Sequence, residues 1–155
     1  ERKLRDAVDK YLDSDAGAHI DYVFIDCPPS LGLLTINAMV AAREVLIPIQ
    51  CEYYALEGLG QLMQTIEMVR THVNPTLAVE GVVLTMFDSR TNLSQQVAED
   101  VRGFLEGRVR VFDTVIPRNV RLSEAPSYGQ PINVYDGKCR GAVAYEELAA
   151  EVLGA

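Results

Sequence analysis

The chain has 155 residues, a formal net charge of −8 and an apolar content of 48%. Its length suits one domain, and its composition is typical of a soluble globular protein. On bulk electrostatics alone, the negative charge argues against a nucleic-acid-binding protein, although a local basic patch remains compatible with it. The 3 cysteines are widely spaced and form no Cys-x-x-Cys pair, which argues against a disulfide framework and a zinc site. No apolar run reaches the roughly 20 residues of a membrane span, so we expect a cytoplasmic protein.

The first predicted element is a helix from Arg2 to Asp13. Leu4, Val8 and Leu12 recur every fourth residue among charged residues, which predicts a single buried stripe. The sequence starts with neither a capping residue nor an initiator methionine. We therefore expect the chain to be a fragment of a longer protein.

The next stretch, Ile20–Ser30, reads Ile-Asp-Tyr-Val-Phe-Ile-Asp-Cys-Pro-Pro-Ser. Its continuous apolar run predicts a buried parallel strand covered on both faces. Pro28 and Pro29 cannot continue a strand ladder, so the chain should leave the sheet just after Asp26. This places Asp26 at the carboxyl end of a strand, where open α/β sheets bind their ligands.

Later segments alternate between strand and helix patterns. The predicted strand Glu44–Gln50 contains Pro48, which should cause a bulge or limit pairing to one side. The other predicted elements are helices Leu33–Ala42 and Ala55–Thr71, strand Val79–Phe87, helix Asn92–Leu105, strand Val109–Ile116, a polar loop Arg118–Lys138 and a closing helix Gly141–Leu153. This order predicts a doubly wound, mostly parallel α/β sheet with helices on both faces.

Asp26 is the first residue that could carry chemistry. An acidic residue at this position could hold Mg²⁺ beside nucleotide phosphates, or it could simply cap the next turn. A phosphate loop would need the pattern Gly-x-x-x-x-Gly-Lys-Ser/Thr, which the chain lacks, and Gly137-Lys138 is better interpreted as a surface turn. Asp26 therefore has another role, or the phosphate cradle lies outside this chain. Cys27 has no neighbouring residue to lower its pKa, so we do not expect a nucleophile.

Four segments together resemble one family. They are Phe24-Ile-Asp-Cys-Pro-Pro-Ser30, Gln50-Cys-Glu-Tyr-Tyr-Ala-Leu-Glu-Gly58, Leu84-Thr-Met-Phe-Asp-Ser-Arg-Thr91 and Val115-Ile-Pro-Arg-Asn-Val-Arg-Leu-Ser-Glu-Ala-Pro126. In this order they resemble the carboxyl-terminal portion of the ParA/Soj-type partitioning ATPases, which have a deviant phosphate loop. The resemblance implies a single but incomplete nucleotide-binding domain of P-loop NTPase type, whose amino-terminal strands and phosphate loop are missing. It also implies an exposed, unpaired edge on the Asp26 strand.

The resemblance assigns roles to residues that match the family. Asp26 would hold Mg²⁺ through water and help to orient the attacking water. Pro117 and Asn119 match the loop around the adenine, whereas the residues alone indicate a strand-ending proline and a turn asparagine. Met86 and Asp88 would lie beside the same pocket as further base contacts.

The resemblance also implies DNA binding without sequence preference through Arg90, Arg118 and Arg121. Guanidinium groups would neutralise backbone phosphates, so binding should weaken steeply with salt. The segment Arg102–Arg121 has five arginines and two acidic residues, a local charge of +5 − 2 = +3. Such a group is also compatible with an ordinary solvated face.

The function implied by the resemblance is ATP-dependent partitioning of a chromosome or plasmid. The whole protein would bind ATP or ADP with Mg²⁺, form a homodimer on ATP binding, associate with nucleoid DNA and respond to a ParB-type centromere-binding protein. Without the phosphate loop, this chain should not hydrolyse ATP by itself. One alternative is a MinD-like, membrane-associated division-site ATPase, although the acidic closing helix argues against membrane binding. The other is a non-catalytic DNA or protein interaction module with the same fold.

Overall fold

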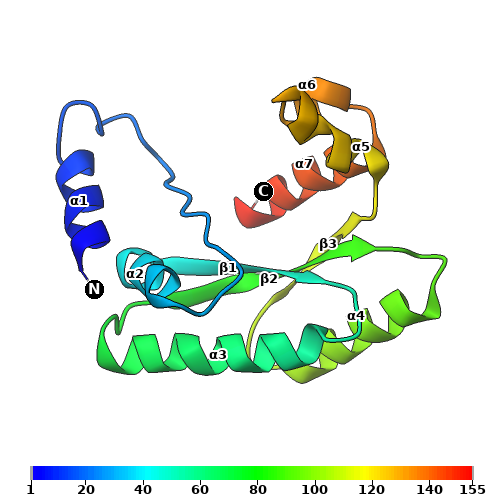
Figure 1. The fold of residues 1–155 in the computed structure, drawn as a ribbon, viewed down its shortest axis with the longest axis horizontal. Helices are drawn as coiled ribbons and strands as arrows, with labels where there is room; N and C mark the ends of the chain where they lie inside the picture. The colour runs from blue at the N-terminus through cyan, green and yellow to red at the C-terminus, as the bar shows by residue number, and fades with distance from the viewer. Residues whose placement is uncertain (1, 155) are drawn as a thin grey trace. The chain divides into compact units, whose positions relative to one another are not determined.

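The computed structural model describes residues 2–154. Helices and strands alternate through most of this range (Figure 1). The elements are α1 (Lys3–Leu12), α2 (Leu33–Ala41), β1 (Glu44–Gln50), α3 (Ala55–His72), β2 (Ala78–Phe87), α4 (Asn92–Leu105), β3 (Val111–Pro117), α5 (Val120–Glu124), the 3₁₀ helix η1 (Ala125–Tyr128), α6 (Ile132–Asp136) and α7 (Arg140–Val152).

The described chain separates into two compact units. The first contains the chain up to Val45 together with Leu59–Val79. The second contains Leu46–Gly58 and the chain from Glu80 onward. The single domain expected from the chain length remains a prediction.

The sheet has the strand order β1-β2-β3. β2 and β3 are parallel, with Val82 opposite Val111 and Phe87 opposite Pro117. The predicted α/β fold with a parallel sheet is confirmed. In the described sheet β1 is an edge strand, which agrees with the one-sided pairing expected around Pro48.

β1 and β2 run in the same direction. The Ala78 N–H donates to the Arg43 carbonyl near the start of the two strands, and the Cys51 N–H donates to the Thr85 carbonyl near their end. All three strands therefore present their carboxyl ends at one edge of the sheet. This is the edge at which open α/β sheets bind ligands.

Within the second unit, α4 and α7 lie on opposite faces of β2 and β3 (Figure 1). Successive strand residues point to opposite faces, so neighbouring apolar residues of β2 can pack against α4 on one face and α7 on the other. The layer under α7 is a buried apolar cluster of Val83, Phe112, Ile116, Ala144 and Leu148. Helices on both faces are the arrangement predicted from the alternating pattern.

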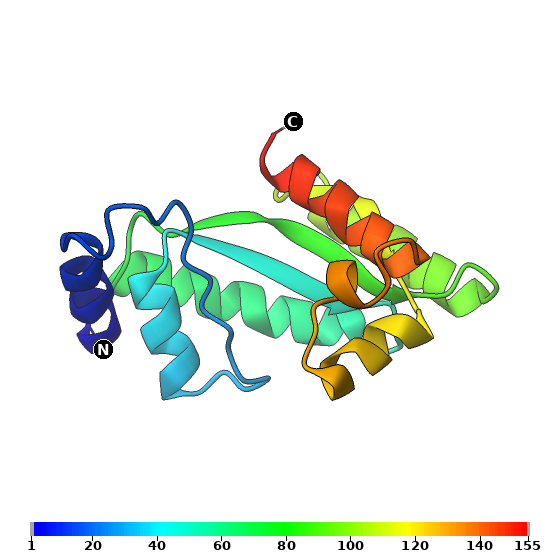
Figure 2. The same cartoon turned by 90° about the horizontal axis from the view of Figure 1, so that it is seen from above.

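Two glycines allow close packing in the second unit. A Cβ atom added to Gly81 would lie 2.6 Å from Cε2 of the Phe112 ring, and one added to Gly141 would lie 2.6 Å from Cγ of Leu122. The first contact seats β2 against a fully buried side chain of β3. The second holds the first turn of α7 against α5, and Figure 2 shows α5 and α6 beside this end of α7.

In the first unit, α1 packs against α2. The expected stripe of Leu4, Val8 and Leu12 is only half-buried, because no residue of α1 is fully enclosed. Asn74, in the turn after α3, connects that turn to the end of α2 through hydrogen bonds. Its Nδ2 donates to the carbonyls of Met39 and Ala42 at 2.9 Å each, and the Asn74 side chain is buried. These carbonyls at the end of α2 would otherwise lack partners.

The predicted buried strand at Ile20–Asp26 is wrong for this structure. These residues form no strand, and the side chains of Tyr22 and Phe24 are 63% and 87% exposed. In Figure 1 the segment between α1 and α2 is a trace without an arrow. The run has strand propensity, but no described strand forms a ladder with it, and propensity without cross-strand packing does not make a sheet.

The predicted polar loop Arg118–Lys138 is also corrected, because it contains α5, η1 and α6. The side chain of Asn119 caps α5, Pro126 occupies the first turn of η1, and Gly129 ends η1 with a left-handed φ of 63°. These are ordinary helix signals at short spacing, but apolar periodicity cannot show helices this short.

Some large apolar residues of α4 and α7 are exposed. Leu93 at the start of α4, and Val143 and Tyr145 on α7, are between 42% and 50% exposed. The buried face of α7 uses Ala144 and Leu148 with Gly141 and Ala142 instead. Small residues therefore form much of this contact, and a search for large apolar residues overlooks them.

Candidate site at the carboxyl ends of the strands

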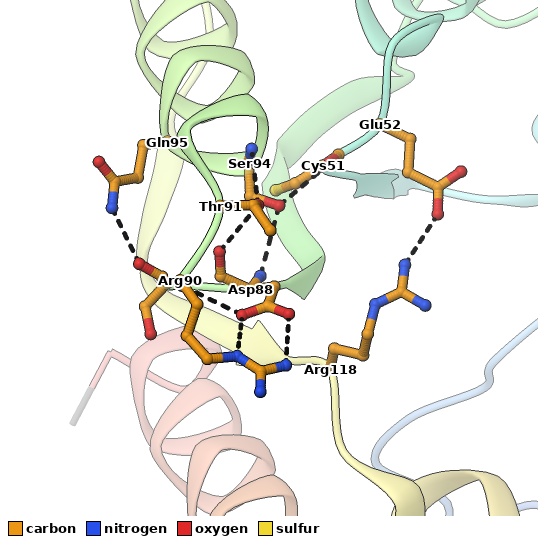
Figure 3. Close-up of polar contacts among 9 residues, drawn as sticks. Cys51, Glu52, Asp88, Arg90, Thr91, Ser94, Gln95 and Arg118 are labelled. Carbon is orange, nitrogen blue, oxygen red and sulfur yellow. Dashed lines mark hydrogen bonds and ion pairs between the residues drawn. The ribbon is translucent and has the colours of Figure 1, made fainter.

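Polar side chains gather where the three strands of the second unit end. Glu52 follows β1, Asp88 follows β2, and Arg118 follows β3 (Figure 3), with Asn119 as the next residue of the chain. Parallel pairing brings these positions to the same edge of the sheet. These side chains include two of the base-contact residues predicted from the sequence, Asp88 and Asn119, and one of the three predicted DNA-binding arginines, Arg118.

Asp88 and Arg90 form a bidentate ion pair. Nε of Arg90 donates to Oδ1 of Asp88 at 2.9 Å, and Nη2 donates to Oδ2 at 2.8 Å. Hydrogen bonds from the Arg90 side chain and backbone, with a smaller contribution from the charge of Arg118, hold the pKa of Asp88 far below its usual range. The pair also raises the pKa of Arg90. Asp88 is therefore a carboxylate whose two oxygens are already engaged.

Thr91 and Ser94 fasten the start of α4 to the strand ends. Oγ1 of Thr91 accepts the Ser94 N–H at 3.3 Å and donates to the Asp88 carbonyl at 3.1 Å. The buried hydroxyl of Ser94 lies 3.4 Å from both the Asp88 nitrogen and the Cys51 carbonyl. The ends of β1 and β2 are thus linked through one side chain of α4.

Met86 has a left-handed backbone, with φ of 54°. Such a conformation is uncommon for a residue other than glycine, and it often marks a functional segment. The pairing of β2 with β3 is irregular between Leu84 and Phe87, which surround Met86. The irregularity lies at the end of β2, immediately before Asp88. This places Met86 at the candidate site, and its base contact remains a prediction.

Arg118 joins the ends of β3 and β1. Its Nη2 donates to Oε1 of Glu52 at 3.0 Å, and both side chains are about half-exposed. The two residues are 66 positions apart in the sequence. Only the parallel arrangement of the strands brings them together, so no local pattern could have predicted this pair.

Asn119 acts as the amino-terminal cap of α5. Its Oδ1 accepts the Arg121 N–H at 2.8 Å, which is the turn role that the residues alone indicated. Pro117 is the last residue of β3 and lies opposite Phe87. Both residues lie at the predicted edge, and their adenine contacts remain predictions.

Arg121 belongs to a polar cluster on α5 and α6. Its Nη1 donates to Glu124 at 2.9 Å, and its Nε lies 3.5 Å from Asp136. The hydroxyl of Tyr135 donates to the same Glu124 carboxylate at 3.2 Å. Burial and the Glu124 charge raise the pKa of Tyr135, and the Tyr128 ring stacks on the Tyr135 ring at a centroid distance of 5.1 Å.

Asp26 belongs to the first unit and is exposed in the extended segment. Burial, and secondarily the charge of Asp26, raise the pKa of the neighbouring Cys27 thiol, which agrees with an unreactive cysteine. Among residues 2–154, no group of three or more His, Cys, Asp and Glu side chains could hold a metal ion. Asp26 is a single carboxylate here, and its Mg²⁺ role remains a prediction.

Sequence reasoning gave no role to Thr91 and Ser94 at this edge. The order Asp88-x-Arg90-Thr91 before an apolar helix pattern contained a usable signal, because Thr is a favoured helix cap and Asp often closes the preceding turn. Glu52 lies in the segment Gln50–Gly58, which contributed to the resemblance, although no local pattern singled out the residue itself.

The chain is similar to curated partitioning proteins over most of its length. A family model described as an AAA domain matches residues 3–79. Chromosome partitioning protein ParA of Myxococcus xanthus is 54% identical over 153 residues, which is 99% of this chain and 52% of that protein. Sporulation initiation inhibitor protein Soj of Bacillus subtilis is 61% identical over 132 residues, which is 85% of this chain and 51% of that protein. The chain spans about half the length of these relatives.

Solved structures support the same fold. Cobyrinic acid a,c-diamide synthase from Mycobacterium smegmatis, solved with bound ADP and magnesium, superposes with a TM-score of 0.74 at 39% identity, covering 97% of this chain and 51% of that one. The septum site-determining protein MinD from Pyrococcus horikoshii, complexed with Mg-ADP, superposes with a TM-score of 0.68 at 24% identity, covering 97% of this chain and 56% of that one. The second likeness shows the fold alone.

None of the helices in the described range is both long and apolar enough to span a membrane. The residues at the polar edge come from three of the four segments that suggested the family, Gln50–Gly58, Leu84–Thr91 and Val115–Pro126. Sequence identity of 54–61% to ParA and Soj extends across most of the chain. The chain belongs to the ParA/Soj family of chromosome-partitioning proteins.

Proposed function

We propose that this chain supplies the base-binding edge and the DNA-binding arginines of an ATPase that partitions a chromosome or plasmid. The observation that carries the proposal is the meeting of three family-like segments at the carboxyl ends of parallel strands, with Glu52, Asp88 and Arg118 at one edge of the sheet in the second unit and Asn119 next to Arg118 in the chain. The identity to ParA and Soj supports the partitioning role.

The residues at this edge fit a nucleotide base better than its phosphates. The Asn119 side chain and the backbone after Pro117 offer neutral polar groups, while the charges of Arg90 and Arg118 at this edge are already paired with Asp88 and Glu52. The chain has no glycine-rich phosphate cradle. Pro117, Asn119 and Met86 would therefore contact the adenine, and other parts of the whole protein would hold the phosphates.

ATP with Mg²⁺ would supply the phosphoanhydride bond whose hydrolysis resets the protein. The contribution of Asp26 would be to hold the metal through water and to orient the attacking water, as phosphoryl transfer requires positioning and charge stabilisation. In the part of the chain that the structure describes, no group of three or more potential ligand residues forms a metal cage, so we propose that Asp26 contacts the ion through water. Asp26→Ala in the natural full-length protein should abolish ATP turnover while DNA binding in the presence of a non-hydrolysable ATP analogue persists.

Arg90, Arg118 and Arg121 would bind DNA phosphates in an ATP-dependent homodimer on the nucleoid. A ParB-type centromere-binding protein would stimulate hydrolysis and release the DNA. Each guanidinium has donors beyond those used in its ion pair, so a phosphate can be contacted without complete loss of the pair. The exposed acidic residues Glu146 and Glu147 on α7 offer no support for the MinD-like, membrane-associated alternative.

The decisive experiment measures duplex DNA binding by the natural full-length protein across a range of salt concentrations. Arg121→Ala should weaken binding to all sequences alike and reduce the salt slope by about 1. Lys138→Ala, which removes a positive charge outside the proposed set, is the matched control. Equal effects of the two substitutions, or sequence-dependent losses, would contradict the assignment of Arg121 as a phosphate contact.

Asn119→Ala separates the nucleotide role from the DNA role. It should weaken ADP binding, measured by calorimetry, because an adenine contact is lost. Since the cap of α5 is lost as well, Asn119→Asp provides the control: it keeps the capping oxygen but removes the amide donor. Wild-type ADP affinity in Asn119→Asp would show that the amide does not contact the base.

A further inference from the structure

All three arginines proposed to bind DNA already have carboxylate partners within the chain. Each guanidinium lies within 3.0 Å of an acidic oxygen, although each side chain is at least half-exposed. The pairs are Arg90 with Asp88, Arg118 with Glu52, and Arg121 with Glu124. The surface that should attract phosphates therefore contains its own competing anions.

The pair between Glu52 and Arg118 differs from the other two. Asp88 and Glu124 lie two and three residues from their arginines, so their pairs belong to local turns. Glu52 reaches Arg118 from a different strand end, 66 residues away. This pair forms only while the segment after β1 lies beside the segment after β3.

Glu52 can be displaced from Arg118. Its side chain is 55% exposed and that of Arg118 is 51% exposed, so water already screens the attraction. A single Nη2–Oε1 contact joins them, in contrast to the two-contact pair of Arg90 with Asp88. A phosphate oxygen that approaches Arg118 meets both a competing acceptor and a repelling charge.

We propose that Glu52 is a built-in competitor of DNA, which holds Arg118 in an ion pair and thereby limits the affinity of the protein for the phosphate backbone. This inference rests on the proposed DNA-binding function of Arg118. An exposed ion pair corresponds to a factor of roughly 1.5 to 5 in affinity, so the effect is a moderate restraint on binding. It favours rapid release of DNA, because the carboxylate replaces the departing phosphate.

The test compares four variants of the natural full-length protein with the wild type by fluorescence polarisation on one labelled DNA duplex, at several salt concentrations. Glu52→Gln should bind DNA about 1.5- to 5-fold more tightly, with a salt slope steeper by up to about 0.9 as Arg118 engages one more phosphate. Arg118→Ala should weaken binding. The double variant Glu52→Gln/Arg118→Ala should bind like Arg118→Ala alone. Glu146→Gln, an equal charge change on the exposed face of α7, should leave affinity within error of the wild type.

The outcomes separate the inference from the function on which it rests. If Arg118→Ala binds DNA like the wild type, the DNA-binding assignment of Arg118 fails, and the competitor role fails with it. If Arg118→Ala weakens binding but Glu52→Gln changes nothing, the DNA-binding role stands and the competitor role is overturned. A gain that persists in the double variant, or an equal gain in Glu146→Gln, overturns it too, because either result shows a general charge effect.

Discussion

Two apolar runs of this chain end in an aspartate, and the structure treats them differently. Ile20–Asp26 forms no strand in the first unit, and most of its residues are exposed. β2, which ends one residue before Asp88, lies between two strands, and its Val82 and Leu84 are fully buried. The two sequences have similar strand propensity. The difference shows that burial comes from neighbouring strands and covering helices, and not from the apolar run itself.

The largest expected effect comes from replacing one phenylalanine in each region. Phe112 on β3 is 0% exposed and Phe24 is 87% exposed. Phe112→Ala should lower the free energy of unfolding by about 3–5 kcal/mol, because it removes a ring from the core and leaves a cavity. Phe24→Ala should change it by less than about 0.5 kcal/mol. Urea denaturation measures both, and an equal loss for the two variants would show that the Ile20–Asp26 run is buried in solution.

The close contact of β2 with β3 provides a second test. Gly81→Ala places a methyl group 2.6 Å from the Phe112 ring and should cost about 1–3 kcal/mol of folding stability through overpacking. Gly103→Ala is the control, because nothing lies within 4 Å of the new Cβ on α4 and alanine should favour the helix by about 1 kcal/mol. The two substitutions should shift the urea midpoint in opposite directions. A stabilising Gly81→Ala would show that the strands are more loosely packed than described.

Glu151 offers a pH-dependent test of how α7 is attached to β3. Its carboxylate accepts the backbone N–H groups of Asp113 and Thr114 at 2.8 and 3.0 Å, and also pairs with Arg110. Partial desolvation opposes the charged form, but these hydrogen bonds outweigh it and lower the pKa of Glu151 from 4.5 to about 2. The folded state therefore binds fewer protons than the unfolded state at this site. The resulting stability is present above pH 4.5 and is lost as the pH falls toward about 2.

Glu151→Gln should remove that part of the pH dependence and cost about 1–2 kcal/mol near neutral pH, because one amide oxygen cannot replace the carboxylate. Thermal unfolding between acid and neutral pH measures the effect. Glu147→Gln, on the exposed side of the same helix, is the matched control. Parallel pH profiles for wild type and Glu151→Gln would contradict the proposed attachment.

Cysteine labelling compares the exposure of the two regions without any substitution. Cys27 is exposed beside the extended segment, whereas Cys51 at the end of β1 is buried. Partial burial is the main cause that raises the pKa of the Cys27 thiol, and burial raises the pKa of Cys51 although the charge of Arg102 opposes it. A thiol reagent should therefore modify Cys27 first, faster as the pH rises, and reach Cys51 only after unfolding. Mass spectrometry of the labelled peptides would detect the reverse order, which would contradict the exposure of this segment.

The sequence predicted most of the regular fold but only part of the site. Periodicity located α3, α4, β1 and β2 closely, because each is long enough for its apolar pattern to be distinct. It missed α5 and α6, which have five residues each and contain no complete apolar stripe. The end of β3 near Pro117 followed from the proline itself. The pairing of Glu52 with Arg118 depends on the order and register of strands, which a single sequence does not contain.

The buried amide of Asn74 has a consequence for how the first unit opens. It connects the carbonyls at the end of α2 to the turn after α3, across more than 30 residues of sequence. Neither segment can loosen without breaking these bonds, so amide hydrogens at the end of α2 and around Asn74 should exchange with solvent at similar rates. The turn and the helix end would then behave as one cooperative folding element, although the chain between them contains a strand and a long helix.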